Sequence, residues 1–404
     1  MTDSAILQPG LQQPGWQMDR FIVATALAGF ALLGGLIWLE TAPFMVALFV
    51  IGTVLGMALY HGAFGFTAGW RNLVVKKRGA GMRAQLMLFG VSSVIMVPML
   101  YSGQAGLVGA VAPVGTSLVV GSFIFGLGMQ LGGGCGSGTL FTVGAGNIRM
   151  VVTLVFFIAG TVLGSIHLPW WLDQPGFDPV PLVNTFGVSG AIVVQLVGLG
   201  LIARWVNRIE RKAHGNLERD ELLWKGQAHG VFRTLLSGRW PFTWAILILA
   251  AGNALTLAIS GAPWSITFAF NVWGAKALEV VGVNMSQFEF WTWEYPAMAL
   301  KDSVLTNAPS VMNFGLLLGA MLAAGLANRF NEASRNRPEG RQFLASVVGG
   351  LLLGYGARLG FGCNIGALFS GIASASLHAW IWFACAFAGS LLGIRLRPWF
   401  RLPN

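Results

Sequence analysis

Residues 119–140 read VVGSFIFGLGMQLGGGCGSGTL, and residues 347–368 read VVGGLLLGYGARLGFGCNIGAL. Aligned without gaps at an offset of 228 residues (135 to 363), the two segments are identical at 11 of 22 positions, including Cys135 and Cys363. In each copy an apolar stretch is interrupted by glycines at its cysteine. The duplication predicts two related halves, each with a broken helix at a Gly–Cys motif.

The composition outside these segments predicts a membrane protein. The chain is 55% hydrophobic and only 10% charged, whereas soluble domains carry about 25% charged residues. A membrane-spanning helix needs about 20 largely apolar residues. Such stretches recur at 21–39, 44–61, 82–101, 114–131, 151–168, 187–206, 241–260, 311–329, 342–358 and 377–395. The sequence therefore predicts an all-α polytopic membrane protein with nine to ten spans. Its 56 glycines indicate close helix packing or deliberately broken helices.

The basic residues predict the orientation of these spans. Of the 25 Lys and Arg residues, 22 fall in segments that can all lie on one side of the membrane: residue 20, 61–83, residue 149, 204–239, 329–341 and the tail from 395. The loops at 40–43, 102–113 and 169–186 contain neither Lys nor Arg. Because Lys and Arg accumulate in cytoplasmic loops, we expect both termini in the cytoplasm and the protein in a bacterial inner membrane. The net charge of +10 then reflects orientation rather than nucleic-acid binding.

The domain organisation follows from the same pattern. We expect a cytoplasmic tail at 1–20, a first membrane repeat at 21–206, a basic cytoplasmic linker at 207–240 and a second repeat at 241–404, the two repeats forming one membrane domain. The first cysteine segment ends inside at Arg149, whereas the second begins inside after Arg341. The two copies therefore cross in opposite directions, which predicts an inverted-topology repeat.

A weaker similarity lies upstream of each cysteine segment. GFTAGWRNL at 65–73 aligns with SITFAFNVW at 265–273, with Thr67 opposite Thr267. Both segments follow a full span and are too short to cross the membrane. We expect both to form re-entrant helix hairpins.

The glycines around each cysteine predict the substrate-binding segments. A glycine in a helix costs about 1 kcal/mol relative to alanine, so residues 132–138 should be broken, with the helix resuming at Thr139. In the second copy we expect a turn at 364–366. Irregular backbone at membrane depth is tolerated where it lines a cavity, and helix N-termini attract anions. The predicted substrate-binding residues are Gly134, Cys135, Gly136, Ser137, Gly138 and Thr139, with Gly362, Cys363, Asn364, Ile365 and Gly366 from the second copy.

The two motif thiols indicate the chemical class of the substrate. Cysteine sulfur is soft and polarizable and suits a substrate that presents sulfur or selenium, or a soft metal. A single buried cysteine at packing glycines is more often structural. Two symmetry-related cysteines at helix breaks favour a site. Cys385 has no repeat partner and no adjacent break, so we assign it to helix packing.

Four further residues are possible accessories of the pathway. Arg358 lies five residues before Cys363, and an arginine within a span either attracts an anion or anchors a half-helix. Thr67 and Arg71 belong to the first hairpin, where Arg71 is better explained as an inside anchor. His378 begins the last span, where packing or hydrogen bonding is favoured over ligand binding.

At GGGCGSGTL, GFGCNIGALFSG and SLHAW the sequence resembles the YeeE/YedE membrane-protein family, over about residues 44–395. The resemblance implies an all-helical inverted repeat with re-entrant helix pairs around a central constriction. It also implies uptake of thiosulfate, with Cys135 and Cys363 as the motif cysteines on the substrate path. Some members work with a small TusA-like sulfur-carrier protein in the cytoplasm, which here would be a separate chain.

The first hairpin departs from the family pattern. HGAFGFTAGWRN resembles G-R-F-C-x-T-x-x-F-R-D, and Gly62, Phe64, Thr67 and Arg71 match it. Gly65 stands where the family has a cysteine, and Asn72 where it has an acid. Any pathway through this chain must therefore work with two cysteines.

The sequence thus predicts an uptake permease for a small sulfur-containing anion, thiosulfate being the best single choice. We expect no enzymatic activity, cofactor or bound metal, and the absence of an ATP-binding motif favours a channel-like or secondary process. Two alternatives remain. One is a transporter of another sulfur or selenium compound or of a soft metal, with His378 as a third ligand. The other is a membrane sulfurtransferase using a cysteine persulfide, which would normally have a base or cation beside the thiol.

Overall fold

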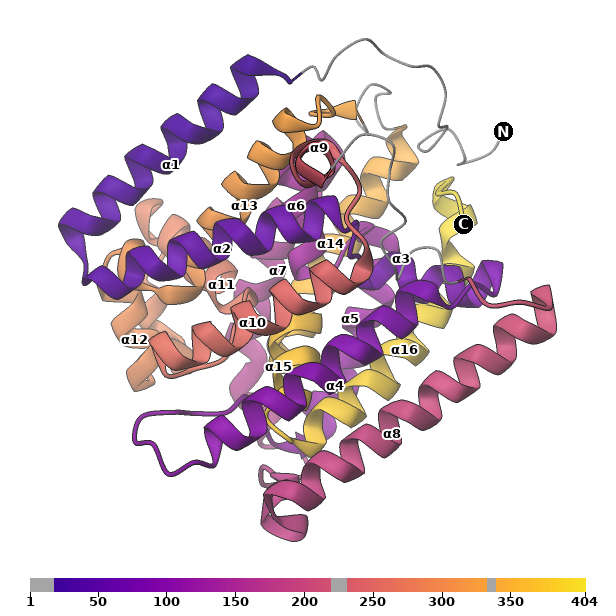
Figure 1. Ribbon diagram of the computed structural model, residues 1–404. Coiled ribbons are helices and arrows are strands. Elements are labelled where there is room, and N and C mark those ends of the chain that lie inside the picture. The colour runs from indigo at the N-terminus through magenta and orange to yellow at the C-terminus, as the bar shows by residue number, and fades with distance from the viewer. Residues whose placement is uncertain (1–17, 219–230, 333–338) are drawn as a thin grey trace.

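A computed structural model describes residues 18–218, 231–332 and 339–404 (Figure 1). Within these ranges helices are joined by turns and loops, with one pair of two-residue strands, and ten helical segments are long and apolar enough to cross a membrane. The predicted fold class, an all-α polytopic membrane protein, is confirmed. The long helices are α1 (Arg20–Glu40), α2 (Pro43–His61), α4 (Ala80–Leu100), α5 (Thr116–Gly132), α7 (Ile148–Leu172), α8 (Leu182–His214), α10 (Phe242–Ser260), α13 (Ala308–Leu326), α14 (Gly340–Leu359) and α16 (Leu377–Leu396).

Shorter elements connect the long helices. They are α3 (Phe66–Arg71), α6 (Gly136–Gly144), α9 (Val231–Ser237), α11 (Thr267–Val280), α12 (Glu294–Lys301) and α15 (Ser370–Ala373). Two π-helices, Asn72–Lys76 and Asn364–Phe369, continue α3 and precede α15. Single 3₁₀ turns occupy Met285–Gln287, Glu289–Thr292, Val304–Thr306 and Arg397–Phe400. Strand β1 (Val114–Gly115) pairs antiparallel with β2 (Gly176–Phe177) and joins two loops at one end of the bundle.

Glycines bring the long helices into direct backbone contact. A Cβ on Gly52 or Gly56 of α2 would lie within 3.0 Å of the backbone of Met312 or Leu316 in α13, closer than real Cβ atoms approach. Equivalent contacts join α7 to α14 and α5 to α16. Small residues at this spacing allow helices without a hydrophobic driving force between them to gain van der Waals contact. Close packing therefore accounts for much of the high glycine content.

The two halves use equivalent helix pairs, and equivalent helices run antiparallel. In α5 and α14, which contain the two repeat copies, Gly121 packs on Gly360 and Gly132 on Gly349. The end of α2 meets the start of its counterpart α10, where the Trp240 N–H donates to the His61 carbonyl over 2.9 Å. The inverted repeat itself stays a prediction. The direction in which each copy crosses a membrane stays a prediction.

Matched side-chain contacts extend the internal similarity beyond the cysteine motifs. Gln85 Nε2 of α4 donates to the Gly65 carbonyl before α3 (3.4 Å), and Asn313 Nδ2 of α13 donates to the Ile266 carbonyl before α11 (3.0 Å). Gln85 and Asn313 are separated by the same 228 residues as the two cysteines (85 to 313). In each half, the span after the hairpin therefore holds the start of the hairpin helix.

The two segments predicted as re-entrant hairpins contain α3 and α11 and differ between the halves, and their re-entrant course stays a prediction. α3 with its π-helix lies between α2 and α4, and a three-residue link at 77–79 follows it. After α11 the chain adds residues 281–307, which contain α12 and have no counterpart in the first half. This insertion is the main departure of the second half from the first.

The described residues can be compared with only part of the predicted domain boundaries. Helices α1 and α8 lie at opposite edges in Figure 1. α8 continues to His214, past the boundary predicted at 206. Most of the tail predicted at 1–20 and the middle of the linker predicted at 207–240 lie outside the described residues, so the domain boundaries stay predictions.

Candidate functional site

Cys135 is the N-cap residue of α6. Its backbone is extended (φ −88°, ψ −168°), and its Sγ accepts a hydrogen bond from the Gly138 N–H over 3.4 Å. Sγ also lies 3.5 Å from Ser137 Oγ and interacts with the Phe66 N–H at the start of α3. The thiol therefore occupies the place that a serine or aspartate oxygen usually takes at a helix start.

The helix after this break begins earlier than predicted. α6 starts at Gly136, so the predicted restart at Thr139 is wrong, and the break is confined to residues 133–135. Gly133 ends α5 in the left-handed conformation (φ +92°). The sulfur cap and complete burial outweigh the cost of about 1 kcal/mol for each glycine in the helix.

Cys363 repeats this geometry in the second half. Its backbone is extended (φ −105°, ψ −169°), and its Sγ accepts from the Ile365 N–H over 3.5 Å. The turn predicted at 364–366 is wrong, because Asn364, Ile365 and Gly366 begin a π-helix. Gly362 has φ +147°, and a Cβ there would lie 2.8 Å from the Ala367 nitrogen, so only glycine fits.

The two cysteine motifs meet inside the bundle. A Cβ on Gly136 would lie 2.8 Å from Cys363 Sγ and 3.5 Å from Ile266, the residue before α11. No side chain at position 136 therefore separates the motifs, and both cysteines are fully buried. The starts of α3, α6, α11 and the second π-helix all converge on the two thiols. We call this the constriction.

Several polar groups at the constriction have no hydrogen-bond partner within the described part of the chain. They are Thr67 Oγ1, Thr139 Oγ1 and both amide atoms of Asn364, all buried. An unsatisfied buried polar group costs about 1–3 kcal/mol. Their concentration beside two thiols therefore favours a segment that receives water or a polar ligand, rather than a sealed core.

A pocket of about 370 Å³, which we call the outer pocket, adjoins Cys363. One wall is the backbone on both sides of Cys363, and another comes from the insertion at 281–307. Its lining includes Thr267, Trp293, Tyr295, Arg358, Gly362 and Gly366. The predicted orientation of the spans places this pocket on the outside.

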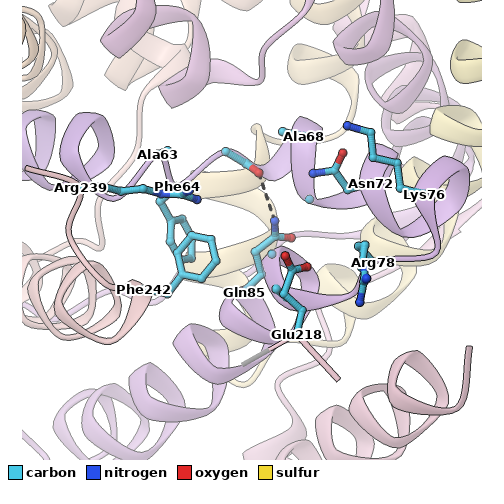
Figure 2. A pocket seen from close by; sticks show the side chains of 14 residues that line it. Ala63, Phe64, Ala68, Asn72, Lys76, Arg78, Gln85, Glu218, Arg239 and Phe242 are labelled. Carbon is cyan, nitrogen blue, oxygen red and sulfur yellow. Dashed lines mark hydrogen bonds between the residues drawn. The ribbon is translucent and has the colours of Figure 1, made fainter. Parts of the chain in front are cut away.

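A second pocket of about 340 Å³, the inner pocket, lies at the start of α3 (Figure 2). Gly65, Asn72 and Gln85 line it, and Phe64 and Phe242 lie on one side of it. Its charged residues are Lys76, Arg78, Arg239 and Glu218. Three cations against one carboxylate give this pocket a net positive charge, which suits an anionic ligand.

Arg358 presents a cation to the outer pocket. Its guanidinium carbon lies 4.7 Å from the centroid of the Phe290 ring, and its Nε has no hydrogen-bond partner among the described residues. The equivalent residue in the first half, at the offset of 228, is Gln130 (130 to 358). Gln130 Nε2 donates instead to the Thr67 carbonyl (3.3 Å) and to Ser390 Oγ (2.7 Å). The same repeat position is thus a structural amide on one side and a pocket cation on the other.

Two arginines hold the end of α5, a role that was not predicted from the sequence. Arg149 Nη2 donates to the Leu131 carbonyl (2.8 Å), and Arg397 Nη1 donates to the Gln130 carbonyl (2.6 Å). Both carbonyls lie in the last turn of α5, where cations are favoured. The sequence offers no signal for this role beyond their basic character, which membrane orientation explains equally well.

The other accessory residues lie outside the two pockets. His378 is buried, with Nδ1 2.6 Å from Ser376 Oγ and a hydrogen bond to the Ala367 carbonyl of the second π-helix. Arg71 ends α3. Cys385, which was assigned to helix packing and not to the pathway, is half-buried in α16. Within the ranges that the structure describes, no group of three or more His, Cys, Asp or Glu side chains could hold a metal ion.

The position of Gly65 yields a testable prediction. A Cβ there would meet only the Ala68 Cβ at 3.7 Å, and its φ of −107° suits any residue. We expect Gly65→Cys to fold like the wild type and to gain a thiol that a membrane-impermeant maleimide labels in inside-out vesicles. Labelling in right-side-out vesicles, or a loss of folded protein, would contradict the placement of the inner pocket.

The chain is similar to a family of transport proteins and to several named transporters. The family model described as sulphur transport matches residues 61–392. The thiosulfate transporter TsuA of Escherichia coli is 28% identical over 360 residues, covering 87% of this chain and 92% of TsuA. TsuA of Spirochaeta thermophila is 27% identical over 350 residues, covering 82% of this chain and 92% of that relative. The probable transporter YedE of Salmonella typhimurium is 35% identical over 161 residues, which span 39% of this chain and only 38% of YedE.

Proposed function

The chain belongs to the sulphur transport family of YeeE/YedE membrane proteins, and on this basis we propose that it takes up a small sulfur-containing anion, thiosulfate, across the bacterial inner membrane. Its relatives are named as transporters, in agreement with a permease rather than an enzyme. In this proposal both termini are cytoplasmic, because that orientation puts the basic loops and the inner pocket inside.

The observation that supports this proposal best is the meeting of two buried thiols between two pockets. Cys363 adjoins the outer pocket through Gly362 and Gly366, and Cys135 contacts the start of α3, whose preceding residue Gly65 lines the inner pocket. An anion that passed from one pocket to the other would encounter Cys363 first and Cys135 second.

The groups along this path match the two ends of thiosulfate. The terminal sulfur is soft and polarizable, like the thiols it would contact. The oxygens carry charge, which Arg358 would meet in the outer pocket and backbone N–H groups at the helix starts would meet in the constriction. Contacts of S–H groups are worth about 0.5–1 kcal/mol. Weak contacts of this kind let the anion be handed from Cys363 to Cys135 and released, without a covalent bond.

The alternatives fit the geometry less well. A soft-metal carrier needs further ligands beside the thiols, and His378 is instead engaged by Ser376 and Ala367. A sulfurtransferase needs a base or cation beside its thiol, whereas the hydrogen bonds of the thiols in the described residues come from backbone N–H groups and Ser137. Other sulfur or selenium anions remain competitors of thiosulfate for the same path. A TusA-like carrier is a proposed partner at the cytoplasmic mouth.

Arg358 yields a prediction about substrate capture. We expect Arg358→Gln to raise the KM for thiosulfate about tenfold, the effect of about 1.4 kcal/mol, because the anion loses a half-buried cation in the outer pocket. Arg358→Lys should retain part of the affinity. The measurement is the concentration dependence of thiosulfate uptake, with exposed Arg341→Gln as the control. An unchanged KM in Arg358→Gln would remove Arg358 from the pathway.

Growth on single sulfur sources tests the proposed function itself. In a bacterial strain that lacks its own sulfate and thiosulfate uptake systems, expression of the chain should permit growth on thiosulfate and not on sulfate. If the protein reached the membrane but supported no growth on thiosulfate, the proposed substrate would be wrong. Rescue by a selenium or metal source alone would favour the corresponding alternative.

A further inference from the structure

A hollow on the surface of α8 is lined by cationic side chains and shares no lining residue with the inner or the outer pocket. Its volume is about 480 Å³, and its lining residues are Gly200, Ala203, Arg204, Asn207, Arg208 and Arg211. The three arginines are exposed. A Cβ on Gly200 would have no atom within 4 Å, so no neighbouring side chain fills the hollow at this position.

Within the part of the chain that the structure describes, no ion pair neutralises the arginines of the hollow. Elsewhere on this face, Arg78 and Arg83 bind the buried carboxylate of Glu210, and Arg401 pairs with Glu339. Arg204, Arg208 and Arg211 have no such partner among the residues that the structure describes. Arg83 Nη1 donates to Asn207 Oδ1 over 3.3 Å, and Asn207 also lines the hollow.

An apolar surface continues from the arginines along α8. Leu201 is 63% exposed and Trp205 49% exposed, and Val197 lies one turn before Leu201 on the same face. Val206, which lies between Arg204 and Arg208 in the chain, packs on Gly79 directly before the start of α4. This contact shows how deep along the neighbouring span the arginines lie. The cations therefore lie where the apolar part of the neighbouring span begins. In a membrane this is the headgroup level, with the exposed apolar residues at acyl-chain depth.

We propose that this hollow binds the headgroup of an anionic phospholipid, with an acyl chain along Val197, Leu201 and Trp205. Guanidinium groups match phosphate oxygens with two parallel hydrogen bonds. Clusters of basic residues beside a span attract the anionic lipids of the cytoplasmic leaflet. A second copy of the chain fits this face poorly, because a twofold contact would bring two sets of arginines together.

Native mass spectrometry of the purified full-length chain tests this assignment. The protein is titrated with phosphatidylglycerol or phosphatidylcholine, and bound lipid and oligomeric state are read together. We expect the wild type to bind phosphatidylglycerol at least about tenfold more tightly than phosphatidylcholine, since each basic residue near the headgroups adds attraction. The combined variant Arg204→Gln, Arg208→Gln and Arg211→Gln should lose this preference.

The matched control removes the same charge elsewhere on the cytoplasmic face, as Arg20→Gln, Arg341→Gln and Arg395→Gln. It should keep the preference of the wild type. If both combined variants lost the preference for phosphatidylglycerol equally, the preference would come from the overall positive charge. If the hollow variant kept the preference, the hollow would not be the lipid site. Displacement of the lipid by inorganic phosphate at equal concentration, or a lipid-free dimer lost only in the hollow variant, would also overturn the proposal.

Discussion

Thiosulfate uptake should fall by more than about tenfold when either Cys135 or Cys363 is replaced by serine, which corresponds to a loss of more than about 1.4 kcal/mol. Serine is the informative substitution because its oxygen is a good helix cap, so α6 and the second π-helix keep their starts. Only the soft sulfur is removed from the path. Uptake is measured in cells that depend on the protein for thiosulfate.

Two controls make this result specific. Cys385→Ser changes the third thiol, which is half-buried in α16 and outside both motifs, and should transport like the wild type. The amount of protein in the membrane should be equal in all variants. Wild-type uptake in both Cys135→Ser and Cys363→Ser would show that neither sulfur acts on the substrate, and the two-thiol mechanism would fail.

The largest expected effect on stability comes from Gly126→Leu in α5. A Cβ on Gly126 would lie within 3.0 Å of the Ala386 backbone of α16, and the nearest atoms are backbone, which cannot rotate away. Overpacking of a well-packed interior typically costs about 1–3 kcal/mol, and here the two helices must separate. We expect little monodisperse protein in size-exclusion chromatography, and a lowered melting temperature for any that remains.

The same substitution at an open position provides the control for close packing. Gly35 of α1 has nothing within 4 Å of its Cβ position. Gly35→Leu should therefore yield wild-type amounts of folded protein. If Gly35→Leu were as damaging as Gly126→Leu, the loss would reflect helix propensity or insertion into the membrane rather than contact between α5 and α16.

The spans were predictable because length and hydropathy determine them almost alone. The last two spans were predicted at 342–358 and 377–395 and are observed at Gly340–Leu359 and Leu377–Leu396. The largest discrepancy is the end of α8, which was predicted at 206 and is observed at His214. At its start, Gly187 is non-helical (φ +68°) and separates residues 182–186 from the span predicted at 187–206. Arg, Lys and Glu end an apolar window but are good helix formers, so the helix continues beyond the hydrophobic segment.

The two residues at the centre of the candidate site were singled out from the sequence, but their surroundings were not. The internal repeat identified Cys135 and Cys363, and the structure brings both into one constriction. The helix start at Gly136 was not predicted because glycine has a low helix propensity. The Cys135 cap and the surrounding packing start the helix there nevertheless. The insertion at 281–307 has no repeat partner, so no pattern indicated that Trp293 and Tyr295 would line the outer pocket.

Arginine roles were the least predictable feature of the sequence. Arg149 and Arg397 lie in basic segments that orient the spans, yet their guanidinium groups hold carbonyls in the last turn of α5. Two roles were predicted for Arg358, namely anchoring of a half-helix and attraction of an anion. Its position above Phe290 in the outer pocket favours attraction of an anion. Such differences depend on tertiary contacts across the bundle and leave no local pattern.

The most direct test of the proposed pathway is transport by the purified chain in liposomes. Radiolabelled thiosulfate and radiolabelled sulfate are supplied outside at equal concentration, and the label retained inside is followed with time. We expect thiosulfate to enter, sulfate to stay outside, and unlabelled thiosulfate to compete with the label. Equal entry of sulfate, or no entry of thiosulfate through correctly folded protein, would contradict a pathway selective for a sulfur-terminated anion.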